Sequence, residues 1–505
     1  MKITNRWLPA LSAATVCIGA FALFCVQPIV ARAILPAFGG AASVWTACLL
    51  FFQFAVLAGY LFAHLTERMT SQRYRTVIRI APAIIAVCLL PVLPDAKPSG
   101  ESPVVGILLT LAAVAGLPSL CLASAGPVIQ SAFARRFPSR SPYRLYALSN
   151  AGSFAALIGY PLIIEPQLTL AAQSSLWSWA FALFAVSFSL TLIVASADSK
   201  EPAPLAQNAS GGEIEESKPS EPPAQTPRVL TRVLWLSYSM IGVSMMMAVT
   251  NQLCRDIASV PLLWALPLSV YLLSFIIAFR QASAPKRWVS VLLFCAASPA
   301  FLFIYFDSLP SMEDAAVLAL QIGAMTIALF VIDLVCHREL YRLRPAPSKL
   351  TGYYLTISLG GALGGVFVGA LAPLLFVNFM ELGWSLFALA ASLIVSGLID
   401  AKPLAGSLRH IRIALPVVLV FAAAGIVRLS TDRTPGVVCQ ERNFYGIIRV
   451  RDTLVQGNEG RIRVRDMRHG TTLHGRQAFA DVDSGQLSLE PTSYYSRSDR
   501  KSTRL

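Results

Sequence analysis

The segment ADSKEPAPLAQNASGGEIEESKPSEPPAQTPR, residues 197–228, divides this chain into two apolar halves of similar size. It is rich in Pro, Glu, Ser and Ala and has almost no apolar side chain to bury. Burial of so little apolar surface does not offset the entropy lost on ordering, so the sequence predicts a disordered linker. On either side of it lie apolar runs of about twenty residues each, the length that crosses a bilayer.

The composition indicates a membrane protein. Of the 505 residues, 55% are hydrophobic and 13% are charged, whereas about a quarter of a soluble domain is charged. The net charge of +14 gathers in short loops, and no basic stripe is interleaved with exposed aromatics, so we expect a lipid bilayer and no nucleic acid as partner. The nine cysteines form no C-x-x-C pair, which favours small buried side chains over a disulfide framework or a metal site.

Twelve or thirteen apolar runs have the length of a membrane span. Six precede the linker, and the run with two prolines, 78–94, is the weakest of them. The others follow the linker, and the thirteenth run would carry the C-terminal tail across the membrane once more. The expected spans are 8–33, 44–65, 78–94, 104–130, 145–164, 174–196, 230–251, 257–279, 288–306, 314–336, 351–377, 380–399 and 412–428.

The loops alternate in charge. Basic side chains follow the second, fourth, eighth and tenth spans, and the intervening loops are nearly free of Lys and Arg. Because basic loops remain on the cytoplasmic side, this pattern predicts a plasma (inner) membrane protein with its N-terminus and the linker in the cytoplasm. The tail is then expected on the outer face. The basic residues are Arg68, Arg73, Arg75, Arg79, Arg135, Arg136, Arg140, Arg144, Arg280, Lys286, Arg287, Arg338, Arg342, Arg344 and Lys349.

The two halves share a faint internal repeat. A small-residue helix that opens at Ser149 has a counterpart at Ser358, and Trp45 has a counterpart at Trp264. Small residues let helices approach closely in lipid, although glycine-rich spans occur in many bundles. We therefore expect an all-α polytopic membrane protein with two six-helix halves, the layout of a major-facilitator-type transporter, followed by a short C-terminal β-rich fragment.

Several polar side chains lie inside the apolar runs, where a charge costs several kcal/mol. Gln27, Arg32, Asp256 and Asp333 are the candidates to line a membrane cavity, and pairing between neighbours is the alternative for each. Asp333 stands four residues before His337, which places both on one helix face. Further polar residues in or near the spans are His64, Glu165, Arg255 and Gln321.

The loop after the second span runs from His64 through Glu67 and Arg68 to Arg73. It resembles an incomplete version of the acidic–arginine gating loop of major facilitators. The glycines of that loop are missing here, which argues against gating by the same route.

A different pattern begins near residue 435. Residues 437–450 have strand composition, 457–460 form a turn signal, and 461–465 alternate as a second strand. The run His469–Gln477, which contains His469, Gly470, His474 and Gly475, is followed by Tyr494 and Tyr495. Together with residues 27–45 and 441–446, it resembles the proteins in which a spermidine synthase-like domain follows a major-facilitator-like membrane region.

This resemblance implies aminopropyl transfer from decarboxylated S-adenosylmethionine to a diamine. Gln477 matches the glutamine that helps to hold the aminopropyl donor in the soluble enzymes of this family. Tyr494 or Tyr495 matches the tyrosine that positions the amine there. His474 departs from the family, which has Asp there. The Gly-rich turn and the catalytic Asp would follow residue 505, so we expect a non-catalytic remnant, no catalytic residue and no cofactor in this chain. His469 and His474 lack a convincing third ligand, so we expect no metal.

The sequence therefore predicts four parts: 1–196, the linker 197–228, 229–429 and the truncated synthase-like 430–505. Three functions remain open. The first is a small-molecule transporter, for example of a polyamine, with a synthase remnant. The others are a membrane-tethered aminopropyltransferase and a membrane anchor without transport.

Overall fold

The computed structural model describes most of both halves and the strands of the tail. The predicted linker beyond Ala197, the predicted thirteenth span apart from residue 423, and Tyr494 and Tyr495 lie outside the described residues. The described ranges are 4–39, 42–93, 103–137, 140, 142–197, 229–256, 261–280, 286–306, 315–346, 349–399, 423, 436–443, 446–457, 460–469, 472–479 and 487–491.

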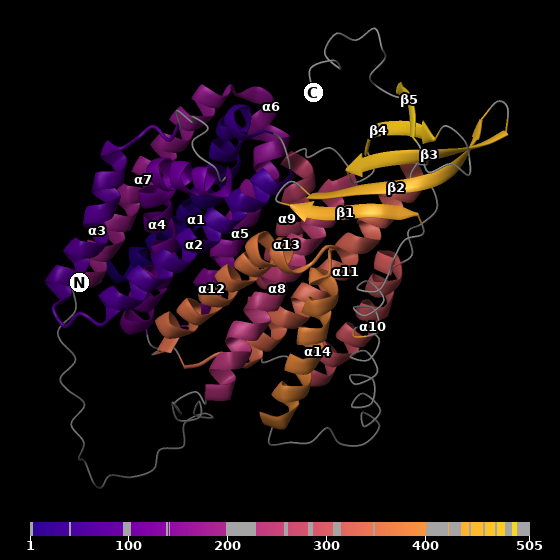
Figure 1. Ribbon diagram of the computed structural model, residues 1–505. Coiled ribbons are helices and arrows are strands. Elements are labelled where there is room, and N and C mark those ends of the chain that lie inside the picture. Colours follow the sequence, from indigo (N-terminus) through magenta and orange to yellow (C-terminus); the bar gives the residue numbers. More distant parts are fainter. Residues whose placement is uncertain are drawn as a thin grey trace.

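Helices form the bundle shown in Figure 1. The first half contains α1 (Thr4–Phe38), α2 (Ala42–Glu67), α3 (Gln72–Cys88), α4 (Pro103–Arg136), α5 (Tyr143–Gly159) continued by a π-helical turn (Tyr160–Ile164) and α6 (Glu165–Gln167), and α7 (Leu170–Ala197). The second half contains α8 (Val229–Asp256), α9 (Pro261–Phe279), α10 (Arg287–Phe306), α11 (Ala315–Arg342), α12 (Leu350–Val366) continued by a π-helical turn (Phe367–Leu371) and α13 (Ala372–Leu375), and α14 (Glu381–Ile399).

The apolar length of these helices makes the chain a multi-pass membrane protein. Among the described residues, eight helices are long and apolar enough to cross a membrane, and three further apolar helices are shorter. The expected span 78–94 is found as the 17-residue helix α3, which begins earlier, at Gln72, and ends at Cys88. The other helices follow the predicted runs.

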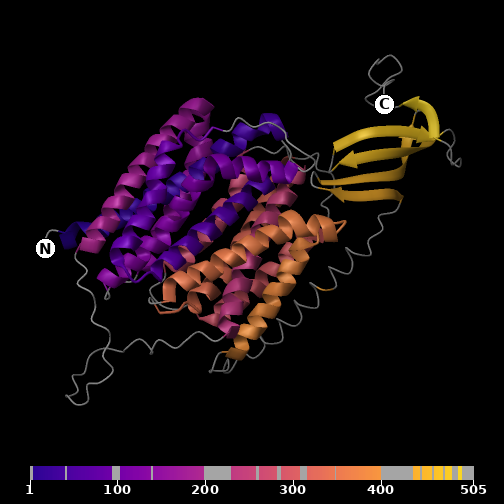
Figure 2. The ribbon, with the colours of Figure 1, turned by 60° about the vertical axis from the view of Figure 1, so that its left-hand side comes forward.

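The two halves repeat one packing scheme. Helix α1 packs on α4, α5 and α7, and α8 packs in the same way on α11, α12 and α14. Helix α2 packs on α4 as α9 packs on α11. The π-helical turns follow α5 and α12, the fifth membrane helix of each half. The predicted arrangement of two six-helix halves is therefore confirmed, and Figure 2 shows them side by side.

Small residues bring α12 against α8. A Cβ on Gly364 would lie 2.5 Å from the carbonyl oxygen of Met240 and 3.1 Å from the hydroxyl of Ser244. A Cβ on Gly360 would lie 2.5 Å from the carbonyl oxygen of Leu236. The backbones touch at these points, so the glycines are required by packing.

Gly364→Ala should lower the unfolding free energy by about 1–3 kcal/mol, because α12 must move away from α8 to admit the methyl group. Gly323→Ala on α11 is the matched control, since no atom lies within 4 Å of its added Cβ. Thermal unfolding in detergent should show a lower Tm for Gly364→Ala only. Equal Tm values for the two variants would contradict the close packing.

The tail folds as a five-stranded antiparallel meander in the order β1-β2-β3-β4-β5. The predicted single strand over 437–450 is wrong, because the chain reverses between Asn443 and Gly446, where Gly446 has φ +137°. The predicted turn at 457–460 is confirmed by the pairing of Gly457 with Gly460. The strands are β1 (Val437–Asn443), β2 (Gly446–Gly457), β3 (Gly460–His469), β4 (Thr472–Phe479) and β5 (Leu487–Pro491).

The sheet is fixed to one end of the second half. The carboxylate of Glu381, the first residue of α14, accepts a hydrogen bond from Arg442 of β1. Gln440 Nε2 donates to Asn378 Oδ1 at 2.7 Å. Strand β1 also contacts α13. We call this the sheet end, and the opposite end, where α2 finishes at Glu67 and α12 begins, the Glu67 end.

Candidate functional site: the interface between the two halves

The halves meet along two symmetry-related pairs of helices. Helix α2 packs on α12, and α5 packs on α9. In each pair, the second membrane helix of one half meets the fifth of the other. Glycines of α12 again allow the approach, because a Cβ on Gly361 would lie 3.1 Å from Gln53 Oε1 and one on Gly365 would lie 3.3 Å from Leu50.

A hydrogen bond between α2 and α12 crosses this interface at the Glu67 end. His64 Nδ1 of α2 lies 3.0 Å from Thr351 Oγ1 at the start of α12. Gly352, the next residue of α12, lies beside the imidazole, since a Cβ there would be in ordinary contact with His64 Cε1 at 3.7 Å. His64, a predicted polar residue of the second span, therefore ties one half to the other.

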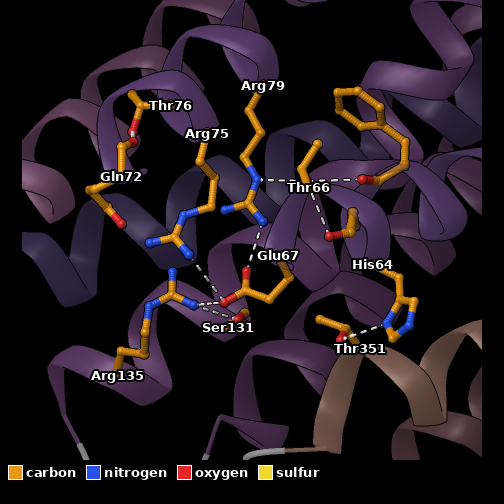
Figure 3. A network of polar contacts seen from close by, with 12 residues as sticks. His64, Thr66, Glu67, Gln72, Arg75, Thr76, Arg79, Ser131, Arg135 and Thr351 are labelled. Carbon is orange, nitrogen blue, oxygen red and sulfur yellow. Dashed lines mark hydrogen bonds and ion pairs between the residues drawn. The ribbon is translucent and has the colours of Figure 1, made fainter. Parts of the chain in front are cut away.

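A charged network lies beside this contact (Figure 3). Glu67 accepts hydrogen bonds from Arg79 Nη2 at 2.7 Å and from Arg135 Nη1, and its carboxylate is 4.0 Å from Arg75 Nη1. Arg79, whose side chain is 3% exposed, also donates through Nε to Thr66 Oγ1 at 2.9 Å. These residues come from α2, α3 and α4, so the network binds helices within the first half.

Aromatic side chains close the interface at the same end. The ring of Tyr354 stacks on Tyr146 of α5 at 4.9 Å and lies 6.1 Å from Tyr60 of α2. Its hydroxyl donates to Gln130 Oε1 of α4 at 2.8 Å. Tyr146 in turn contacts Phe275 and Phe279 of α9 at 5.8 and 4.9 Å. Tyr146 and Tyr354 are buried, so side chains of both halves fill the interface near the Glu67 end.

Polar contacts are also found toward the sheet end. Thr46 Oγ1 of α2 donates to Asn251 Oδ1 of α8 at 2.9 Å, which joins the halves. Arg32 pairs with Glu165 at 3.2 Å within the first half, and its side chain is 43% exposed. Gln27 is buried on the same helix as Arg32. The cavity role of these two residues stays a prediction.

Asp333 is completely buried, and neither carboxylate oxygen has a hydrogen-bond partner among the described residues. His337, one turn later on α11, is equally buried. Its Nδ1 lies 2.7 Å from Ser274 Oγ of α9. The predicted common face is confirmed, since both side chains face Gly242 of α8. Asp256 is the last residue of α8, and its side chain lies outside the described residues.

The synthase-like motif lies on the β3–β4 hairpin. His469 and His474 are strand residues, and their ring centroids are 5.9 Å apart. Gln477 pairs across the sheet with Arg465 and Pro491, and Gly475 pairs with Met467. Gly470 lies outside the described residues. Among the described residues, no group of three metal-ligating side chains is present.

Carboxylates beside this motif are engaged by arginines. Hydrogen bonds from Arg476 to Asp466, at 2.7 and 2.9 Å, hold the pKa of that buried carboxyl below its usual value. Asp452 accepts from Arg465 Nε at 2.7 Å and from Arg463 Nη2 at 3.1 Å, which lowers its pKa in the same way. These pairs have a structural role in the sheet.

Comparison with known proteins gives structures but no sequence family. No family model matches the sequence, and no curated protein matches it. A double-Trp mutant of XylE is 12% identical, with 83% of this chain and 99% of that chain covered and a TM-score of 0.48. A bacterial homologue of the human lysosomal transporter Spinster is 14% identical, with 85% and 98% covered and a TM-score of 0.43.

The peptide transporter POT is 15% identical, with 84% of this chain and 96% of that chain covered and a TM-score of 0.43. All three TM-scores are below 0.5. The assignment of the fold therefore rests on the helix lengths and on the repeated packing of the two halves described above.

The sequence did not single out the tyrosines of the interface. Tyr60, Tyr146, Tyr271 and Tyr354 all fall within a few turns of the Glu67 end of their helices. The loop charges give the direction of each span. With those directions known, sequence analysis could have found that these tyrosines lie at a common depth in the membrane.

Proposed function

We propose that the chain is a membrane carrier for a small molecule, which opens the interface between its halves to the two sides of the membrane in turn. The observation that carries the proposal is the pair of related contacts, α2 with α12 and α5 with α9, closed by side chains at the Glu67 end. Rocking of two repeats about a central site is how such bundles give alternating access.

The contacts that close the Glu67 end are individually weak. A neutral hydrogen bond such as that of His64 with Thr351 contributes about 1 kcal/mol, and an aromatic pair such as Tyr146 with Tyr354 contributes about 0.5–1.5 kcal/mol. A few contacts of this size permit opening at a modest cost. The glycine-mediated contacts within each half would stay intact while the halves move.

A disulfide between cysteines at 64 and 351 is expected to abolish transport, because it would prevent the halves from separating. The variant His64→Cys/Thr351→Cys, in a background without the native cysteines, is reconstituted in liposomes and tested with labelled spermidine, sugars, peptides and nucleosides. Uptake should fall to the level of empty liposomes on oxidation and return on reduction. The single variant His64→Cys is the control, and oxidation should leave its uptake unchanged.

Two outcomes would contradict the carrier. One is the absence of uptake of every compound in that set by the parent protein. The other is uptake that continues after complete cross-linking. A polyamine is the first compound to test, because the tail resembles the spermidine synthase-like domain, and that resemblance is the support for this substrate class. An aminopropyltransferase would instead convert a diamine and decarboxylated S-adenosylmethionine to spermidine without any liposomes.

The orientation follows from the arginines. Arg75, Arg79 and Arg135 gather at the Glu67 end, so we infer that this end faces the cytoplasm and the sheet lies on the outer face. Cys439 of β1 is exposed. An impermeant thiol reagent added to intact cells should label Cys439. Protection of Cys439 from the reagent would contradict this orientation and place the sheet on the cytoplasmic side.

A further inference from the structure

Two ionisable side chains of α11 lie buried in the membrane region, and neither has an ion-pair partner among the described residues. Asp333 and His337 are both 0% exposed. Asp333 Oδ1 and Oδ2 and His337 Nε2 have no hydrogen-bond partner among the described residues. An ionised carboxylate without a donor or a cation is strongly disfavoured in such a place, so the geometry fits Asp333 as a neutral acid that holds a proton.

Ser274 determines which nitrogen of His337 is available. Its hydroxyl has one proton, and it donates that proton to the carbonyl oxygen of Tyr271 at 2.7 Å. At His337 Nδ1, 2.7 Å away, Ser274 Oγ must therefore accept, which places the ring proton on Nδ1. Nε2 then carries a lone pair and is the atom that takes up a further proton.

The lone pair and the carboxyl group face one gap. A Cβ on Gly242 of α8 would lie 3.6 Å from Asp333 Oδ1 and 3.7 Å from His337 Nε2. It would also lie 3.4 Å from Tyr271 Cε2. The absence of a side chain at Gly242 leaves this space between the two polar groups.

No basic side chain among the described residues is bound to Asp333. Arg342, on the same helix, pairs with Glu339 at 2.8 Å. The other titratable side chains beside the pair are Tyr271 of α9, whose ring meets that of His337 edge-on, and Cys336 of α11, the residue before His337 in the chain. On α10, Cys295 is the one titratable residue between Trp288 and Pro299.

The contact between the halves covers this site. The ring of His337 stacks on Phe275 at 3.5 Å and meets Tyr271 edge-on at 4.8 Å. Phe275 in turn contacts Tyr146 of α5, which belongs to the other half. Separation of α5 from α9 would remove that cover, so the same movement that opens the Glu67 end would bring water to His337.

We propose that Asp333 and His337 form a proton-binding site that couples the carrier to a proton gradient. With the Glu67 end closed, Asp333 holds the proton. On opening, the O–H bond of Asp333 breaks, the proton bonds to His337 Nε2 across the Gly242 gap, and water removes it to the solution on that side. The inference rests on the proposed carrier function, because coupling requires transport.

The test uses the full-length protein and two readouts. Infrared titration of the purified protein, without substrate, should show the carbonyl band of a protonated carboxylic acid that Asp333→Asn removes. In proteoliposomes with labelled spermidine, Asp333→Asn should retain exchange between equal pools but lose accumulation driven by a pH gradient. Gly242→Ala, which fills the gap at ordinary contact distances, should lose accumulation in the same way, and Gly323→Ala should behave like the parent.

The outcomes separate the two proposals. A parent protein without exchange of spermidine or of the other compounds contradicts the carrier, and the infrared band still decides whether Asp333 holds a proton. Exchange in the parent with pH-driven accumulation unchanged in Asp333→Asn and in Gly242→Ala overturns the coupling site. Accumulation driven by sodium and independent of pH overturns it as well. Loss of the band in Asp333→Asn together with loss of accumulation in Gly242→Ala supports it.

Discussion

Replacement of Glu67 by glutamine is expected to lower the unfolding free energy by about 3 kcal/mol, one of the two largest effects predicted here. Glu67 is the acid shared by Arg75, Arg79 and Arg135. Arg79 is almost completely buried, so without its partner it would keep a charge that water cannot reach. The amide of Gln has a single acceptor oxygen and no charge, so it cannot neutralise three guanidinium groups, which then repel one another.

Thermal unfolding of the purified protein in detergent checks this result. The Tm of Glu67→Gln should fall by about 5 °C, the size expected for a loss of this magnitude. Arg73→Gln is the matched control, because Arg73 lies exposed on α3, two residues before Arg75, and is not among the described partners of Glu67. A similar Tm for both variants would show that Glu67 acts only through the overall charge of this end.

The same substitution should also affect the interface. Glu67 is one turn from His64, whose bond to Thr351 joins the halves. A loosened end of α2 would weaken that bond, so oxidation of the cysteine pair at 64 and 351 should be slower in the Glu67→Gln background. An unchanged cross-linking rate would mean that the network, which lies within one half, does not influence the contact between the halves.

The helices could be predicted from the sequence because lipid imposes a simple requirement on them. A span must be apolar over its whole length, and the charges that remain mark either its ends or a functional position. Asp333 and Glu67 could be recognised for this reason. Two features could not be inferred: that Asp333 has no hydrogen-bond partner among the described residues, and that three arginines gather at Glu67. Both depend on how neighbouring helices pack.

The tyrosine cluster was missed for a related physical reason. A span that is apolar all round does not show which face meets lipid and which meets another helix. Tyr146 and Tyr354 could equally have been anchors at the membrane surface. The reversal between β1 and β2 was missed because residues 443–446, Asn-Phe-Tyr-Gly, lack the Asn-Gly or Asp-Gly pair of common two-residue hairpins.

The second large effect is expected at the sheet end. Arg442→Met should weaken the attachment of the sheet by about 3–5 kcal/mol, because Glu381 would remain as a buried carboxylate without its partner. The two side chains are 4% and 1% exposed. The variant also removes the bond of Arg442 Nη1 to the carbonyl oxygen of Asn378, at 2.7 Å, and the stacking of the guanidinium over Phe379 at 4.4 Å.

Hydrogen–deuterium exchange measures this attachment directly. The amides of β1 in Arg442→Met should exchange about 150- to 5,000-fold faster, the factor that corresponds to such a loss, while the amides of α8 and α12 stay protected. Arg461→Met is the control, because Arg461 lies exposed on β3 and has no part in the attachment. Equal exchange in both variants would mean that the strands, and not this ion pair, hold the sheet in place.

A double-mutant cycle then separates the pair from its surroundings. Glu381→Gln alone leaves the cation of Arg442 buried, so it should weaken the attachment of the sheet nearly as much as Arg442→Met. When both are replaced, neither charge remains unpaired, and the double variant should lose less than the sum of the two single losses. Additive losses would contradict a direct interaction and would place the attachment in the remaining contacts, chiefly the 2.7 Å bond of Gln440 to Asn378.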